Sequence, residues 1–219
     1  MTISHHLDDA TLMSFAAGTL AQSLSAVAEA HIELCAQCRT ELRKADALAG
    51  HVLAQESEVE ISADLKSKVM AQLDTATLHR FPQAQAKPQS GGLPRSLTQW
   101  TGLKNLDEIK WQRSAPGIEV AKLAKPKGEP GFFGLLRIQP GKAVPDHGHG
   151  GTELTLILSG AYHDELGRFQ RGDIADLDES ISHKPVAEGS EPCICLVAND
   201  APTAFRSWAA RLMQPMIGI

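Results

Sequence analysis

The sequence predicts a multidomain protein in which an all-α, four-helix domain precedes an all-β domain. Apolar residues recur at helical spacing through residues 8–80, whereas short strand-like runs separated by turn residues follow residue 98. Between these regions, residues 81–98 contain three prolines, two adjacent glycines and few apolar residues, a composition typical of a linker. We therefore expect domains at residues 1–80 and 99–219, joined by a flexible linker over residues 81–98.

Four helices are expected in the first domain. Asp8 can cap the first helix and Gly18 can end it, while Ser62 can cap the fourth after an acidic stretch. Helical spacing predicts the inner faces of the second, third and fourth helices, which comprise Leu24, Val27, His31 and Leu34 or Cys35; Leu42, Ala45, Ala49 and Val52; and Leu65, Val69, Leu73 and Ala76.

The second domain is expected to be built from short strands. The runs most typical of strands cover residues 119–123, 132–138, 152–158 and 193–197. Proline- and glycine-containing turns such as residues 125–131 and 139–142 separate them. This pattern predicts a β-barrel or a β-sandwich.

The formal charge of −5 lies entirely in the first domain. Residues 1–80 contain eleven acidic and six basic residues, whereas residues 81–219 contain fifteen of each. This bias argues against direct binding of nucleic acid and suits a basic partner, although an ordinary solvated helical surface would give the same count.

No apolar run approaches the ~20 residues of a membrane span, and the start of the chain does not resemble a secretory signal. We expect a cytoplasmic protein with no membrane contact, whose four cysteines serve as metal ligands or buried thiols rather than disulfides.

A first group of potential metal ligands lies in the helical region. On a helix, His31, Cys35 and Cys38 fall within about 60° of arc, so one metal ion could reach all three. Two thiolates and two imidazoles suit a closed structural zinc site, for which His5 or His6 could supply the fourth ligand. Spacing alone does not choose between these two histidines. The alternative is a buried histidine beside two core thiols.

A second group lies in the β region. His147 and His149 share one face of a strand, Glu153 opens the next apolar run, and His183 follows thirty residues later. Three imidazoles and one carboxylate suit a more open site for zinc, iron, manganese, nickel or copper.

The first group carries a family resemblance. The segment from His6 to Leu20, running into the H-x3-C-x2-C pattern of residues 31–38, resembles the zinc-binding anti-sigma domain. The resemblance selects His6, which stands six residues before Leu12. It implies a four-helix domain that wedges between the two globular regions of an extracytoplasmic-function-type sigma factor. The fourth helix would contact the sigma factor or would pack on its own bundle.

The second group resembles the first motif of the cupin barrel. The residues that carry the resemblance are Gly141-x5-His147-x-His149-x3-Glu153-x6-Gly160. The resemblance implies a β-barrel that holds a metal ion.

The second cupin motif is altered in this chain. Counted from Gly172, His183 stands at the position of the family's fourth ligand. Asp178, Ser180 and Ala187 replace the family's proline, glycine and asparagine. The departures put the local loop geometry in doubt more than the ligand.

As a whole, the chain resembles the ChrR-type anti-sigma factors, in which a zinc anti-sigma domain precedes a cupin. This resemblance implies a regulator, not an enzyme, that inhibits a sigma factor and releases it under oxidative, singlet-oxygen-like stress. It also implies zinc in the first domain and zinc or another divalent metal in the cupin. Because a linker separates the two groups, we expect each site to load independently.

Two other functions remain open from the residues alone. The open cupin site could belong to a metalloenzyme, a dioxygenase or isomerase, with a zinc-binding regulatory domain. Alternatively, the chain could be a metal-sensing scaffold whose partner is not a sigma factor. Cys193 and Cys195, which share a strand face, could act near the cupin metal or simply fill the core.

Overall fold

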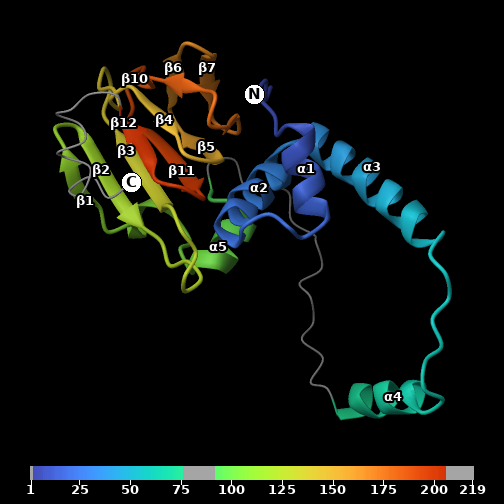
Figure 1. Ribbon diagram of the computed structural model, residues 1–219. Coiled ribbons are helices and arrows are strands. Elements are labelled where there is room, and N and C mark those ends of the chain that lie inside the picture. Colours follow the sequence, from blue (N-terminus) through green and yellow to red (C-terminus); the bar gives the residue numbers. More distant parts are fainter. Residues whose placement is uncertain (1, 76–91, 206–219) are drawn as a thin grey trace.

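The structure, a computed structural model, describes residues 2–75 and 92–205 (Figure 1). We call residues 2–75 the helical domain and residues 92–205 the β domain. The expected linker therefore lies outside the described residues up to position 91. The last residues of the expected linker are helical instead: a helix begins at Arg95, and the Leu97 side chain is completely buried.

The helices and one short 3-10 turn are α1 (Asp9–Ala16), α2 (Gln22–Leu34), α3 (Ala36–Leu53), α4 (Leu65–Thr75), α5 (Arg95–Thr101) and η1 (Leu106–Glu108). The expected ends of α1 are confirmed. The Asp8 carboxylate accepts a hydrogen bond from the Thr11 backbone N–H at 2.6 Å, and Gly18 adopts a positive φ of 67° after the helix.

The helical domain differs from a closed four-helix bundle. Only Cys38 and Ala45 of α3 are buried, so Ala49 and Val52 do not form the expected inner face. Helix α4 begins at Leu65 rather than just after Ser62 and lies apart from the other helices (Figure 1). The apolar periodicity of α3 and α4 is genuine, but within this chain nothing among the described residues covers it.

The β domain contains twelve strands among the described residues: β1 (Gln112–Ala115), β2 (Ile118–Lys122), β3 (Phe133–Ile138), β4 (His147–His149), β5 (Glu153–Ser159), β6 (Ala161–Asp164), β7 (Gly167–Gln170), β8 (Ile174–Leu177), β9 (Ser182–His183), β10 (Val186–Glu188), β11 (Cys193–Asn199) and β12 (Thr203–Phe205). A six-stranded sheet has the order β1-β2-β3-β11-β5-β8, and two three-stranded sheets have the orders β10-β6-β7 and β12-β4-β9. The four strands expected from the sequence are β2, β3, β5 and β11, with ends shifted by at most two residues.

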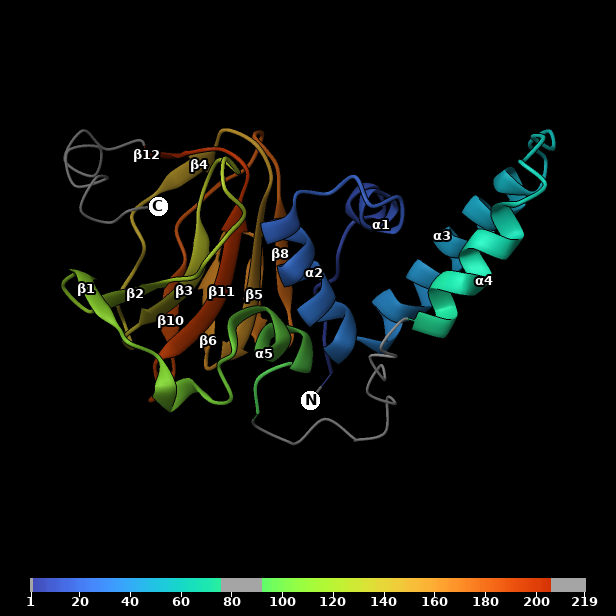
Figure 2. The ribbon, with the colours of Figure 1, turned by 90° about the horizontal axis from the view of Figure 1, so that it is seen from below.

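The central strands of the large sheet are buried on both faces. Along β5, Leu154, Leu156 and Leu158 pack in a cluster with Leu24 and Val27 of α2. The intervening positions of β5 face the interior of the β domain. Figure 2 shows α2 and α5 against the outer side of β11 and β5. The two domains therefore share one hydrophobic core, which the linker composition did not predict.

Within the described residues, no helix has both the length and the apolar content needed to cross a membrane.

Candidate metal centres

The four predicted ligands of the helical domain come together from three short segments. His6 lies in the extended segment before α1, His31 in the last turn of α2, and Cys38 in the first turn of α3. Cys35 is both the C-cap of α2 and the N-cap of α3, so the helix junction itself presents its thiol. One ligand atom from each residue lies within 4.8 Å of the others.

The distances within this cluster suit a tetrahedral zinc ion. Nε2 of His31 lies 3.2 Å from Sγ of Cys38, and Nδ1 of His6 lies 3.3 Å from Sγ of Cys35 and 3.8 Å from Sγ of Cys38. Nitrogen and sulfur ligands at ordinary zinc bond lengths are about 3.5 Å apart at a tetrahedral angle. The residues present therefore fit zinc.

Burial favours the neutral forms of His31 and Cys38 when no cation is nearby. It lowers the pKa of His31 to about 4 and raises the pKa of the Cys38 thiol to about 12. A neutral imidazole is the form that binds metal, whereas a thiol must lose its proton. A divalent cation would stabilise the Cys38 thiolate against this burial.

The neighbouring His5 lies outside the cluster. Its ring stacks on Phe169 of β7 with centroids 4.0 Å apart, and its Nδ1 lies 3.7 Å from the buried Asp173 carboxylate. The structure thus places His6 with the two cysteines, and it places His5 against the β domain.

The four predicted ligands of the β domain also come together. His147 and His183 face each other across the β4–β9 pair, with their Nε2 atoms 3.2 Å apart. His149 lies on the same face of β4, and its Nδ1 is 3.3 Å from Oε2 of Glu153 on β5. All four residues are buried, with one ligand atom from each within 4.8 Å of the others.

Hydrogen bonds orient two of these rings toward the common point. Nδ1 of His183 bonds the Asp164 carboxylate at 2.8 Å, and Nδ1 of His147 bonds the Pro145 carbonyl at 2.8 Å. Each bond leaves Nε2 available, the arrangement usual for metal-binding histidines. Nε2 of His149 is buried without a hydrogen-bond partner among the described residues, and a metal ion would satisfy this ring nitrogen.

Charge at this site favours an ionised carboxylate. Burial alone would raise the pKa of Glu153, but the surrounding imidazoles, with His149 first, outweigh it and lower that pKa to about 2. The hydroxyl of Thr155 also donates to Glu153 at 3.1 Å. The site therefore offers three imidazoles and one carboxylate, a set that fits several divalent metals.

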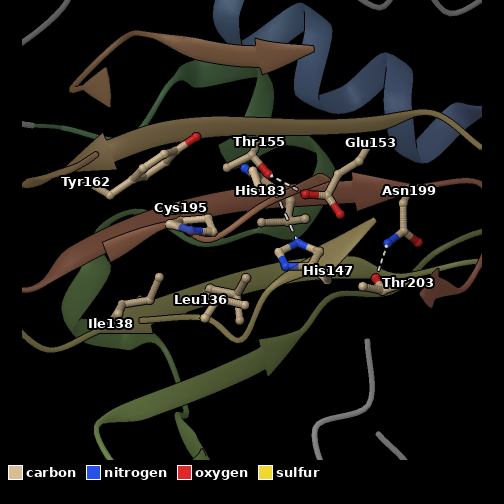
Figure 3. Close-up of a pocket in the computed structure, with 13 residues that line it drawn as sticks. Leu136, Ile138, His147, Glu153, Thr155, Tyr162, His183, Cys195, Asn199 and Thr203 are labelled. Carbon is tan, nitrogen blue, oxygen red and sulfur yellow. Dashed lines mark hydrogen bonds between the residues drawn. The ribbon is translucent and has the colours of Figure 1, made fainter. Parts of the chain in front are cut away.

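A cavity of about 30 Å³ opens beside the β-domain cluster (Figure 3). Tyr162 and Cys195 line it together with apolar side chains of β3 and β11. The hydroxyl of Tyr162 is buried and has no hydrogen-bond partner among the described residues. Cys193 and Cys195 are both buried, with sulfur atoms 3.6 Å apart, so Cys195 belongs at once to the core and to the cavity wall.

The altered second motif still forms a turn. The Asp178 carboxylate accepts hydrogen bonds from the backbone N–H of Ser180 at 2.8 Å and from its hydroxyl at 2.5 Å. This side-chain turn takes the place of the family's proline and glycine and leads into β9, where His183 joins the cluster.

Comparisons with known proteins agree with this architecture. The ChrR cupin-like domain family matches residues 101–202. The anti-sigma-E factor ChrR of Cereibacter sphaeroides is 41% identical over 219 residues, covering all of both chains. The chain belongs to the ChrR family of anti-sigma factors. The crystal structure of Rhodobacter sphaeroides SigE in complex with the anti-sigma ChrR matches with a TM-score of 0.76 and 38% identity, covering 91% of this chain and 100% of that one.

This ChrR-family chain also contains site residues that sequence reasoning missed. Asp164 belongs to neither predicted ligand set, yet it orients His183. Gly172, Asp173 and Asp176 contact the segment around His6 and the His31 ring. No sequence signal identifies the contacts of Gly172, Asp173 and Asp176, because each joins residues more than 140 positions apart. The contact between Asp164 and His183 joins residues that are 19 positions apart.

Proposed function

We propose that this chain is an anti-sigma factor that binds and inhibits an extracytoplasmic-function-type sigma factor through its helical domain. The full-length 41% identity to an anti-sigma-E factor supports this proposal. Since sigma factors act on RNA polymerase, the inhibitor would work in the cytoplasm, with no direct contact to nucleic acid or membrane.

The observation that carries the proposal is an uncovered apolar surface on α3, α4 and the segment between them. Among the helices of the helical domain, α2 packs on the β domain. The apolar side chains of α3, α4 and the segment between them remain accessible to a partner. Its large apolar side chains are 40–81% exposed and comprise Leu48, Val52, Leu53, Val59, Ile61, Leu65, Val69 and Met70. Exposed apolar side chains in this number, on three consecutive segments, favour a protein-binding role for this part of the chain.

A groove between α1 and α3 continues this surface. It encloses about 290 Å³ and is lined by Asp9, Leu12, Met13, Glu41, Lys44, Ala45 and Leu48. Apolar side chains at its floor and carboxylates at its rim suit an amphipathic, basic segment of a sigma factor.

A matched pair of variants on α4 tests the interface. Val69→Asp puts a charge on the apolar side of α4, whereas Ser67→Asp puts the same charge about 160° around the helix. We expect Val69→Asp to weaken binding of an extracytoplasmic-function-type sigma factor by at least tenfold, as loss of an interface anchor does. Binding is measured by calorimetry. Equal effects of the two variants would refute the assigned surface.

We further propose zinc at His6, His31, Cys35 and Cys38, and zinc or another divalent metal at His147, His149, Glu153 and His183. The first site would be structural. The second would take part in releasing the sigma factor under oxidative, singlet-oxygen-like stress, so an empty site would leave inhibition intact and block release. Metal analysis of the purified chain, with and without each ligand set, tests both assignments.

The cavity beside the β-domain cluster supports a role other than catalysis. At about 30 Å³ it holds little more than a water molecule, whereas pockets for small-molecule ligands span roughly 300–1,000 Å³. A dioxygenase or isomerase would need room for its substrate. Turnover of a small substrate by the metal-loaded chain would contradict the non-catalytic role.

A further inference from the structure

The N-terminal segment that brings His6 to its cluster is attached to the β domain by one buried carboxylate. Oδ1 of Asp173, which is fully buried, accepts the backbone N–H of Ser4 at 2.7 Å and of His5 at 3.1 Å. The His5 carbonyl in turn accepts the Ile174 N–H at 3.4 Å. The residues immediately before His6 thus bond to the start of β8.

A second contact reaches His31 directly. Nδ1 of His31 donates to the Gly172 carbonyl at 2.9 Å, which fixes the ring so that Nε2 faces Cys38. Gly172 has a φ of 91°, and a Cβ there would lie 2.9 Å from the side chain of Ile3. The positive φ favours glycine at this position, and the turn before β8 presents the Gly172 carbonyl to His31.

A third contact holds the start of α1. The Asp176 carboxylate accepts the Asp8 backbone N–H at 3.0 Å and the Thr11 hydroxyl at 3.2 Å. The residues on both sides of His6 are therefore hydrogen-bonded to β8 or to the turn before it.

Strand β8 also lies next to the metal-ligand cluster of the β domain. It pairs with β5, where Leu177 is opposite Glu153, and six residues later the chain supplies His183. A metal ion that fixes Glu153 and His183 would thereby hold β8 at its far end.

We propose that β8 and the turn before it form the outer shell of the zinc site in the helical domain and couple the two metal sites. Metal in the β domain holds β8 in place, and β8 then holds His6 and His31 in position for zinc. The inference rests on the two metal sites proposed above. Such coupling is reciprocal, so zinc in the helical domain strengthens metal binding in the β domain by the same factor.

The test uses cobalt(II) and zinc as probes of the full-length chain. Cobalt bound to thiolates has a charge-transfer absorption that the β-domain ligand set lacks, so this signal reports the helical-domain site alone. Competition between the two metals then gives the zinc affinity of that site. Asp173→Ala and Asp176→Ala are compared with Glu191→Ala, which removes an exposed carboxylate from the turn between β10 and β11.

We expect Asp173→Ala to lower the zinc affinity of the helical-domain site about tenfold, as loss of an outer-shell partner does, and Glu191→Ala to leave it unchanged. Asp176→Ala removes only bonds to the helical domain, so its loss of affinity cannot come from a disturbed β-domain turn. Emptying the β-domain site with Glu153→Ala should lower the same affinity about fivefold in the unmodified chain, but cause no further loss beside Asp173→Ala.

The outcomes separate the inference from the proposed metal sites. A chain that shows no cobalt–thiolate absorption would overturn the helical-domain metal site and the inference with it. Zinc binding of equal strength in Asp173→Ala, Asp176→Ala and Glu191→Ala would overturn the inference alone. Fully additive effects of Glu153→Ala and Asp173→Ala would overturn the coupling and leave only the outer-shell role.

Discussion

Replacement of Cys38 by serine should detach α3 from the rest of the helical domain. Cys38 is completely buried, and its sulfur lies 3.2 Å from Nε2 of His31 and 3.8 Å from Nδ1 of His6. Cys38→Ser keeps the shape of the side chain but removes one of two thiolates, so the cluster loses the composition of a closed zinc site.

The magnitude follows from how little else holds α3. Of its 18 residues, Ala45 is the only buried one besides Cys38, and Leu42 is partly buried against the core. Burial of these two side chains contributes about 1–3 kcal/mol, whereas a structural zinc contributes on the order of 10 kcal/mol in small modules. Loss of the metal would therefore remove most of the free energy that holds α3 against α2, so α3 should undock.

The assay combines zinc analysis with amide hydrogen exchange. Cys38→Ser should lose one zinc ion per chain, and α3 amides should exchange rapidly while β5 amides remain protected. Cys193→Ser, which makes the same change at an equally buried thiol of the β domain, is the matched control and should keep zinc in the helical domain. Unchanged zinc content and unchanged α3 exchange in Cys38→Ser would refute the proposed site. Zinc loss with α3 still protected would refute the energetic argument only.

Three further results are expected. His6→Ala should abolish zinc binding in the helical domain, whereas His5→Ala should retain it at saturating zinc. Metal analysis of the two variants measures this difference. Equal loss of zinc in both variants would contradict the choice of His6 as the ligand. Asp164→Asn should weaken metal binding in the β domain about tenfold, because an amide accepts the hydrogen bond from Nδ1 of His183 less strongly than a carboxylate does. An unchanged affinity in competition titrations would contradict this role of Asp164. Glu153→Ala should empty the β-domain site yet leave sigma inhibition intact in unstressed cells, because zinc in the helical domain binds strongly enough to survive a modest loss of affinity. A sigma-dependent reporter, measured with and without singlet oxygen, should show that release of the sigma factor fails. Constitutive release would contradict this prediction.

Local chemistry made part of the structure predictable. Asp8 and Gly18 mark the ends of α1 because capping and positive φ depend on adjacent residues alone. The runs that became β3, β5 and β11 were recognisable because strand-forming residues and the turns between them are local signals. The exposure of Val52 and Val69 was not predictable, since helical periodicity specifies an apolar face but not whether the chain itself covers it.

The two clusters were predictable for a related reason. The pattern of residues 31–38 lies at one helix junction, and that of residues 147–153 lies on adjoining strands, so short-range geometry brings most of each set together. His6 and His183 needed the family resemblance, because their distance in sequence carries no geometric information.

The sequence by itself determined the two kinds of domain, their order, most of each candidate ligand set and the acidic character of the helical part, because each depends on residue type and local spacing. Only the tertiary structure decided that the domains share a core, that Leu97 belongs to it, and that Gly172, Asp173 and Asp176 hold the segment around the first cluster. These contacts join residues far apart in the chain. They depend on how α2 packs on β5 and β11, and no pattern within either segment specifies that packing.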